Sequence, residues 1–362
     1  MRCNRYAART LAVCAAVALL ASGCASTATP SGDATTTTTT AKASTVSQVA
    51  GEDEMFTDRD RDASYDESAV AVTLKDNASA CKDKGVSVSG NVVTITKAGT
   101  YRLSGTLTNG RVVVDADKSD KIQLVLDGVT INCDTSAALY VKQADKVFVT
   151  LASGSRNTLS NKKDFVAVDD NNIDAVIFSK EDLTLNGAGA LTVQAAYGHG
   201  IVSKDDLVVT GGTIAVTAAR HALAGKDSVR IADGSLTLTA GKDGIHAENK
   251  DDTTLGNVTI TGGSLNVTSD GDGVDAAGTL TITGGDFGIT TGGGSPETIS
   301  NGGNSFGFGK TSSSSTDSSD TTSMKAFKSD GELHISGGTF RIDAYDDSVH
   351  SNSSVTIDGG DF

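Results

Sequence analysis

Residues 199–245 read HGIVSKDDLVVTGGTIAVTAARHALAGKDSVRIADGSLTLTAGKDGI, and this stretch decides the fold. His199, His221 and Asp243 stand 22 residues apart in it, and each opens a short turn that leads into an apolar residue. Between these positions lie two runs in which apolar and polar residues alternate, separated by a glycine turn such as Gly211-Gly212. Alternation with period two is typical of strands that bury one face. Self-similarity at a fixed period indicates stacked structural repeats.

The same three columns recur along most of the chain. The turn column comprises Asp174, His199, His221, Asp243, Asp272, Lys325 and Asp347, and the second column comprises Leu183, Leu207, Val229, Val258, Leu280, Leu333 and Val355. The third column includes Ile214, Leu236, Leu265 and Phe340. Three strands and three corners in about 22 residues predict one coil of an all-β solenoid. Because one coil cannot bury its own apolar residues, neighbouring coils must stack as parallel strands.

The flanking segments divide the chain into predicted regions. Residues 1–24 combine a basic start, an apolar run and Cys24, which indicates a lipoprotein-type export signal with Cys24 as the lipidation site; an ordinary secretory cleavage site is the alternative. Residues 25–80 are expected to form a disordered tether, residues 81–109 an N-terminal cap, and residues 110–362 the solenoid, with a low-complexity loop at 292–323. We expect the protein on the extracellular face of the membrane, anchored by lipid. The last coil stops unfinished at Phe362, so either the gene product is truncated or further coils are missing.

Composition narrows the classes of partner. The chain has 41 glycines, two prolines, no tryptophan and a formal net charge of −15. This charge argues against nucleic acid, which needs a basic surface. Cys81 and Cys133 remain once the leader is removed, and in an oxidising compartment they could pair as a disulfide. The chain is expected to be a monomer.

Carboxylates crowd the turn column in its later repeats. A side chain in one repeat lies about 4.8 Å from its counterpart in the next, so stacked aspartates repel unless a cation intervenes. We therefore predict calcium as the cofactor, with ligands drawn from the set Asp243, Asp270, Asp272, Asp275 and Asp347. The alternative is that these aspartates only fill solvent-exposed turns. His199 and His221 replace the acid in two repeats, which weakens the pattern there.

A second corner repeats lysine. Lys180, Lys204 and Lys226 occupy it in successive repeats, where a row of ammonium groups would suit the carboxylates of a uronic-acid polymer. A solvated turn whose charges cancel is the alternative. The sequence shows no nucleophile and base, and no paired carboxylates, at a spacing typical of catalysis.

The order of these motifs resembles a known bacterial family. The segments Ser203-Lys204-Asp205-Asp206-Leu207, Gly241-Lys242-Asp243-Gly244-Ile245 and Lys121 to Val129 are similar to the cell-surface carbohydrate-binding domain family typified in cellulolytic clostridia, over about residues 86–362. The resemblance implies a right-handed single-stranded parallel β-helix, pectate-lyase-like, that binds calcium and acidic plant polysaccharide such as polygalacturonate. Cellulose binding is also known in the family. It implies no enzymatic activity.

Together these features predict a noncatalytic, calcium-dependent polysaccharide-binding domain at the cell surface. One alternative is a polysaccharide lyase acting on uronic-acid polymers, for which Lys242 and Lys250 are the nearby candidate bases. A second alternative is a structural adhesin or spacer in which calcium only stiffens the domain.

Overall fold

The computed structural model describes residues 55–295 and 323–362. The predicted export signal with Cys24, and most of the predicted loop at 292–323, lie outside these described residues. Apart from one short helix, α2 (Asp58–Arg61), the regular structure in the described ranges consists of strands. The prediction of an all-β protein is confirmed.

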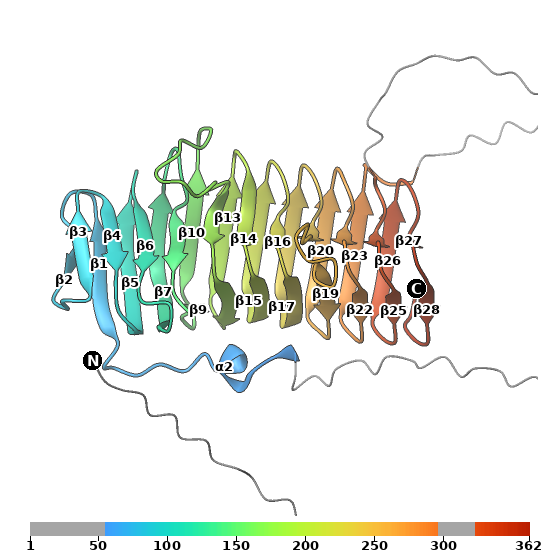
Figure 1. The fold of residues 1–362 in the computed structure, drawn as a ribbon, viewed down its shortest axis with the longest axis horizontal. Coiled ribbons are helices and arrows are strands. Elements are labelled where there is room, and N and C mark those ends of the chain that lie inside the picture. The colour runs from blue at the N-terminus through green and yellow to red at the C-terminus, as the bar shows by residue number, and fades with distance from the viewer. Residues whose placement is uncertain (1–54, 296–322) are drawn as a thin grey trace, which may run out of the picture. The chain divides into compact units, whose positions relative to one another are not determined.

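The described strands form two sheets (Figure 1). The smaller sheet has eleven strands: β3 (Val86–Ser89), β4 (Val92–Ile95), β6 (Arg111–Asp115), β8 (Leu139–Gln143), β11 (Ala175–Ser179), β14 (His199–Ser203), β16 (Leu223–Gly225), β18 (Ile245–Ala247), β21 (Val274–Ala276), β24 (Phe327–Ser329) and β27 (Val349–Ser351). The larger has seventeen: β1 (Val70–Lys75), β2 (Ala80–Cys81), β5 (Gly99–Leu107), β7 (Lys121–Asn132), β9 (Lys146–Leu151), β10 (Arg156–Asn161), β12 (Asp182–Gly187), β13 (Ala190–Ala195), β15 (Asp206–Ala218), β17 (Ser228–Ala240), β19 (Asn257–Ile260), β20 (Ser264–Ser269), β22 (Leu280–Ile282), β23 (Asp286–Thr291), β25 (Leu333–Ile335), β26 (Thr339–Ala344) and β28 (Val355–Ile357).

Parallel pairing joins successive repeats in the register that the apolar columns predict. Leu207 pairs with Val229, which pairs with Val258, and the same column continues to Leu280 and Leu333. Residues of this column are buried, and in β17, β22 and β25 their neighbours along the strand are more exposed. The alternation thus places one apolar residue of every repeat above the next, and the stacked columns form one continuous core.

The prediction of a right-handed single-stranded parallel β-helix with three strands per coil is wrong. Six strands, namely β7, β9, β12, β15, β13 and β10, pair in a closed ring of parallel neighbours. The other eleven strands of the larger sheet continue its ladders beyond this ring, and the second sheet is separate. The ring closes because β7 and β15 run through a corner without interruption, so one half of each strand belongs to one ladder and the other half to another. A sequence pattern that treats every corner as the end of a strand misses this.

The register of one repeat differs from the predicted columns. Ile201 pairs with Leu223 and Ile245 with Val274, 22 and 29 residues apart, as the columns place them. Ile177 pairs with Ile201, 24 residues apart, whereas the columns put 25 residues between Asp174 and His199. Ala175, rather than the predicted Asp174, therefore aligns with His199. The N-terminal ends of the sheets also differ from the parallel stack, because β1 pairs with β2, and β3 with β4, in antiparallel orientation.

Glycine builds the corner between the second and third columns. Gly212 has a φ of +98°, a conformation that side chains with a Cβ rarely adopt. Its neighbour Gly211 packs so closely on the preceding repeat that a Cβ there would lie 2.9 Å from the carbonyl oxygen of Gly187. Corresponding glycines occur in the later repeats, so this corner has a backbone surface with few side chains.

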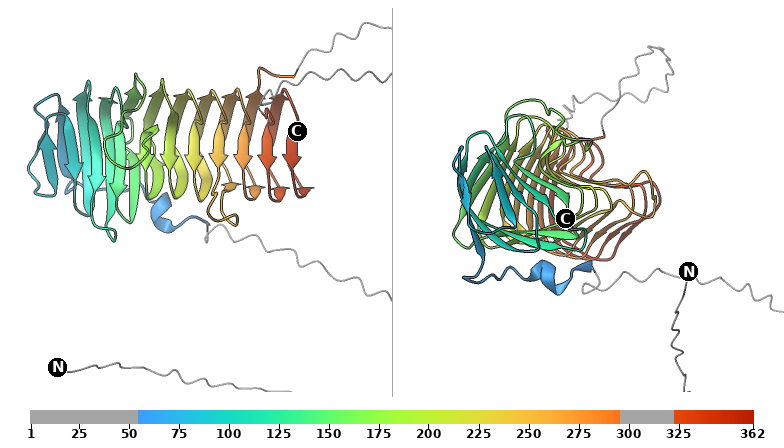
Figure 2. Two further views of the ribbon diagram at one scale, coloured as in Figure 1. Left: turned by 45° about the horizontal axis from the view of Figure 1, so that its top comes forward. Right: turned by 60° about the vertical axis from the view of Figure 1, so that its left-hand side comes forward.

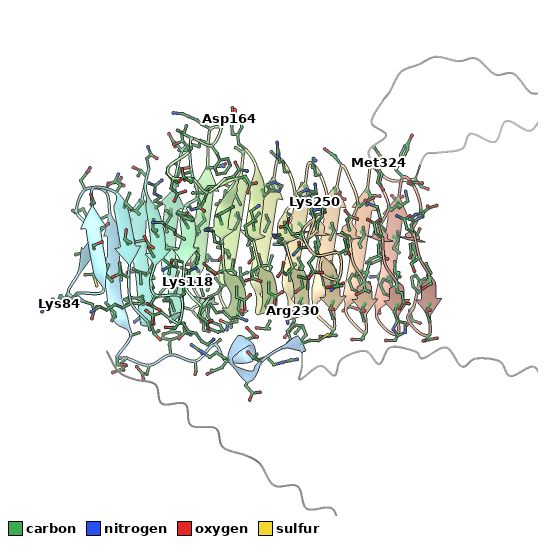
Figure 3. The ribbon with its side chains drawn as sticks, in the orientation of Figure 1. Lys84, Lys118, Asp164, Arg230, Lys250 and Met324 are labelled. Carbon is green, nitrogen blue, oxygen red and sulfur yellow. The ribbon has the colours of Figure 1, made fainter. Side chains whose placement is uncertain are left out.

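The N-terminal boundary lies earlier than the predicted tether and cap suggested. Residues 55–64, which we call the strap, contain α2 and lie along the larger sheet, and β1 pairs with β5 within that sheet (Figures 1 and 2). Asp60 of the strap is 2% exposed and lies 2.8 Å from Lys146 Nζ on β9. Arg230 on β17 donates to the carbonyl of Met55, and Figure 3 shows Arg230 beside this segment.

Two further observations concern the predicted anchor and disulfide. None of the helices in the described ranges is long and apolar enough to cross a membrane. Cys81 and Cys133 are both free thiols; Cys133 is buried and Cys81 is partly exposed.

Candidate functional site

An open groove of about 1200 Å³ follows the glycine corner across several repeats. Its floor consists of the corner glycines, and α2 and the residues after it border it. The lining residues are Arg61, Ala63, Gly187, Ala188, Thr210 to Thr213, Asp233 to Ser235, Gly262 to Ser264, Gly285, Asp286, Gly338, Thr339, Gly360 and Asp361. The sequence showed the glycine pairs but not that they border a groove, because a glycine turn alone does not reveal which way the chain bends.

Polar side chains form a line along this groove. Thr213, Ser235, Ser264, Asp286 and Thr339 occupy the same register position in successive parallel strands, and Asp361 continues the line through a bridge to Thr339. At about 4.8 Å per strand, the five intervals of this line span about 24 Å. The groove therefore presents a hydroxyl or a carboxylate at the spacing of the repeat, over a floor of backbone.

The structure brings the three predicted lysines into one row. Lys180, Lys204 and Lys226 directly follow residues that pair with one another in the smaller sheet. Lys226 Nζ lies 2.6 Å from Asp251, and Lys204 lies 3.9 Å from Asp174 and 5.4 Å from the ring centroid of Phe178. Lys180 and Lys204 are exposed. The predicted row of lysines is therefore present. Lys204 and Lys226 have acidic neighbours, and Lys204 also lies near an aromatic ring.

Four side chains of the turn column cap the next repeat, namely those of His199, His221, Asp243 and Asp272. Asp243 accepts a hydrogen bond from the backbone N–H of Asp272, at 2.8 Å, and Asp272 accepts one from the N–H of Lys325, at 2.7 Å. His221 Nδ1 lies 3.3 Å from the N–H of Asp243 in the equivalent position. The predicted stacking of His199 on His221 is observed, with ring centroids 4.9 Å apart. Histidine and aspartate can thus replace each other in this column, because either can accept a backbone N–H.

A second row lies beside the turn column and was missed in the sequence. The row consists of paired residues in successive strands of the smaller sheet: His246, Asp275, Lys328 and His350. Each stands next to an inward-facing residue of its strand. His246 Nδ1 lies 3.0 Å from Asp275 and 3.4 Å from Asp243, and its ring stacks on His221 with centroids 4.3 Å apart. The sequence did contain the signal, because these residues follow the inward positions Ile245, Val274, Phe327 and Val349.

Charges in this cluster are strongly coupled. Burial alone would lower the pKa of His246, but hydrogen bonds to Asp243 and Asp275 outweigh it and raise the pKa to about 9. Burial alone would raise the pKa of Asp243, yet the adjacent imidazoles of His221 and His246 leave it well below its usual range. Burial lowers the pKa of His221, and the adjacent carboxylate of Asp243 only partly opposes this. At neutral pH, His246 is therefore a buried cation between two carboxylates.

Lys328 is the cation beside the carboxylates of Asp272 and Asp275. Lys328 Nζ lies 2.9 Å from Asp275 and 3.5 Å from Asp272, which is 1% exposed. Burial raises the pKa of Asp272. Burial would also raise the pKa of Asp275, but His246 and Lys328 hold it below its usual value.

The donors around Asp243 do not fit calcium, which prefers six to eight oxygen ligands. Two imidazoles and a lysine surround the predicted ligands Asp243, Asp272 and Asp275, and backbone N–H groups use oxygens of two of them. The other predicted ligands, Asp270 and Asp347, are exposed, and Asp347 lies 3.2 Å from His350 Nδ1. Calcium binding by this protein stays a prediction.

The candidate bases of the lyase alternative lie at the surface. Lys250, labelled in Figure 3, is 3.4 Å from Glu248, and its side chain is 79% exposed. Lys242 is exposed as well. Neither position fixes an amine against the buried carboxylates.

Comparison with known proteins gives a consistent result. A protein of Acetivibrio thermocellus described as a carbohydrate-binding domain-containing protein is 42% identical over 155 residues, which is 42% of this chain and 54% of the relative. The match thus spans about half the length of that relative. A solved structure, that of the polysaccharide lyase-like protein from C. thermocellum as a gadolinium derivative, is 38% identical, with a TM-score of 0.60, and covers 62% of this chain and 92% of the other. The model of the carbohydrate-binding domain-containing family matches residues 89–362, so this chain belongs to that family.

Proposed function

We propose that this protein binds polysaccharide without cleaving it, and that the glycan lies along the glycine-floored groove. The observation that carries the proposal is the line of hydroxyls and carboxylates, in register from Thr213 to Asp361, above a floor without side chains. Membership of the carbohydrate-binding domain-containing family supports it.

The groove suits a polymer better than a small ligand. It is open and extends over several repeats, so a chain of sugars can meet an equivalent polar group at each repeat. Carboxylates such as Asp233 and Asp286 accept hydrogen bonds from sugar hydroxyls, and charged acceptors form stronger hydrogen bonds than neutral ones. The glycine floor lets the glycan approach the backbone. Many weak, equivalent contacts then add up along the polymer.

Charge favours a neutral glycan in this groove. Asp233, Asp286 and Asp361 line it, whereas Arg61 lies at its border. A uronic-acid polymer would bring its own carboxylates close to these acids, and like charges at short range repel. We therefore infer that a neutral polymer such as cellulose is the groove's ligand.

An acidic glycan has a separate candidate surface. The exposed Lys180 and Lys204 lie one repeat apart, so they can contact successive carboxylates of polygalacturonate. Lys226 can also contact the glycan although it pairs with Asp251, because surface ion pairs contribute only about 0–1 kcal/mol and exchange readily. In this second candidate function, calcium bridges the glycan to exposed acids such as Asp270 and Asp347.

We propose that the predicted leader directs this binding domain out of the cytoplasm. Cys24 would attach the chain to the outer face of the membrane through lipid, and residues 25–54 would link it to the strap. Bound polysaccharide would then be held near the cell.

Binding is tested with residues 25–362, incubated with insoluble cellulose and with immobilised polygalacturonate, with calcium and with chelator. Thr213→Trp fills the groove, while Thr217→Trp is the matched control, since Thr217 is an exposed threonine on the same strand outside the groove. We expect Thr213→Trp to lose cellulose binding and Thr217→Trp to retain it. Soluble product is assayed in parallel, and we expect none.

Three results would contradict the proposal. Equal binding by both variants would place the glycan elsewhere. Formation of unsaturated uronate product would favour the polysaccharide lyase. If the protein binds neither polymer, a structural spacer would be the better interpretation. Loss of polygalacturonate binding on substitution of Lys180 and Lys204 by alanine would support the second surface.

A further inference from the structure

We propose that His221, Asp243 and His246 form a binding site for a zinc-class divalent ion, which would join two adjacent repeats. One ligand atom from each of these residues lies within 4.8 Å of the other two. Asp243 Oδ2 lies between the imidazoles, 3.0 Å from His221 Nδ1 and 3.4 Å from His246 Nδ1. The proposal is independent of glycan binding.

The fold fixes the positions of these three donors. His221 comes two residues before β16, Asp243 comes two residues before β18, and His246 lies on β18 itself. Parallel pairing of Leu223 with Ile245 holds the two repeats in register. The side chains are only 12–19% exposed, so the rotamer freedom that binding would remove is already limited.

The donor types select the ion. Two imidazole nitrogens and one carboxylate oxygen match a zinc site with three protein ligands and one open position. Calcium and magnesium prefer all-oxygen sites, so these ions should bind poorly here. Ligands bound to zinc at about 2.0–2.2 Å lie at most about 4.4 Å apart, so a small rotation of the stacked imidazoles brings all three into range.

The Nδ1 atoms of both imidazoles already face the carboxylates of the cluster. His246 Nδ1 lies 3.0 Å from Asp275 and 3.4 Å from Asp243. His221 Nδ1 lies 3.0 Å from Asp243 Oδ2 and 3.3 Å from the backbone nitrogen of Asp243. A bound ion would exchange these contacts for bonds from both nitrogens to the metal.

Neighbouring groups confine the site to these residues. Lys328 occupies the far side of Asp275 and approaches Asp272. Glu248 lies 3.8 Å from His246 Nε2 and can orient that imidazole after metal binding. On the other side, His199 stacks on His221, with ring centroids 4.9 Å apart.

The test uses dialysed protein and titration calorimetry with zinc, cobalt and calcium as separate probes. We expect one zinc or cobalt ion per chain and a visible cobalt spectrum typical of nitrogen ligation. His246→Gln and His221→Asn should each weaken zinc binding by more than the roughly 10–100-fold that loss of an outer partner costs. His350→Gln is the matched control, because His350 lies in the same row as His246, three repeats away.

Absence of zinc binding to the wild-type protein would overturn the proposal. Unchanged affinity in both His246→Gln and His221→Asn would overturn it too, because the ion would then bind elsewhere. If a variant fails to fold, the cobalt spectrum of the wild-type protein decides alone: an all-oxygen spectrum, or full competition by calcium, contradicts the imidazole site.

Discussion

Removing the charge of Asp60 should release the strap from the sheet. Asp60 Oδ1 lies 2.8 Å from Lys146 Nζ, and it also accepts a hydrogen bond from Thr184 at 2.6 Å. Both ends of the ion pair are nearly inaccessible, with side chains 2% and 10% exposed. Breaking a buried pair by removing one partner costs about 3–5 kcal/mol, because the other charge remains buried. Asp182, 3.9 Å from Lys146, partly compensates, so the lower end of this range is expected for Asp60→Asn.

The loss of stability caused by Asp60→Asn should be confined to the strap. Strap contacts with the sheet are confined to a few residues, whereas the sheet has its own continuous core, so the strap can detach while the strands stay folded. About 3 kcal/mol corresponds to a roughly 100-fold change in an equilibrium constant. Hydrogen exchange followed by mass spectrometry should show residues 57–64 exchanging roughly 100-fold faster in Asp60→Asn, with little change in β20 or β23.

A double variant and pH provide controls. Adding Lys146→Met should restore much of the protection from hydrogen exchange. The ammonium of Lys146, left without its partner, is then replaced by an apolar side chain beside Phe148. Burial alone would raise the pKa of Asp60, but hydrogen bonds from Lys146, Thr184 and Thr57 leave it below 3.8. A lowered folded pKa stabilises the docked strap above the unfolded value of 3.8, and this stabilisation is lost as pH falls through the folded pKa. Strap exchange in Asp60→Asn equal to that of the wild-type protein would refute the reasoning.

Three further predictions concern the stack itself. Gly285 has a φ of +114°, so Gly285→Ala should lower the free energy of unfolding by about 1–3 kcal/mol in urea denaturation, with Ser264→Ala as a near-neutral control; equal effects would contradict the strained corner. Phe340 is 4% exposed, so Phe340→Ala should cost about 3–5 kcal/mol in the same assay, against little for the exposed Tyr345→Ala. In chelator, the raised pKa of His246, about 9 against 6.5 in the unfolded chain, adds stability that is complete below pH 6.5 and lost as pH rises through 9. Thermal melts across this window should fall more steeply for the wild-type protein than for His246→Gln, and parallel curves would count against the buried cation.

The strand registers could be predicted from the sequence because the inward residues are large and regular. A shift of one residue would turn Leu207 or Val229 toward solvent, so the apolar pattern itself specifies the pairing. Where the repeat length changes, this argument weakens, and Asp174 was accordingly placed one residue out of register.

The arrangement of the strands could not be predicted in the same way. Whether a strand ends at a glycine corner or continues through it depends on backbone hydrogen bonds that the side-chain pattern does not report. β7 and β15 continue through their corners and close the six-stranded ring, which contradicts the three-strand coil. The strap was also missed, because residues 55–64 are mostly polar and are held by the buried Asp60 rather than by an apolar stripe.

The candidate sites were recovered only in part. The row of Lys180, Lys204 and Lys226 follows directly from the register. Acidic residues around Asp243 were seen, but not that His246 would lie among them, since its partner Asp275 is 29 residues away and belongs to the next strand. Electrostatic pairing between repeats becomes visible only once outward positions are stacked in the same register as inward ones.

The most direct test of the central claim is a crystal structure of residues 25–362 with a bound cello-oligosaccharide. We predict the sugar chain above Gly212, Gly263 and Gly285, with its hydroxyls hydrogen-bonded to the line from Thr213 to Asp286. An oligosaccharide bound outside this groove, along the lysine row for example, would contradict the account.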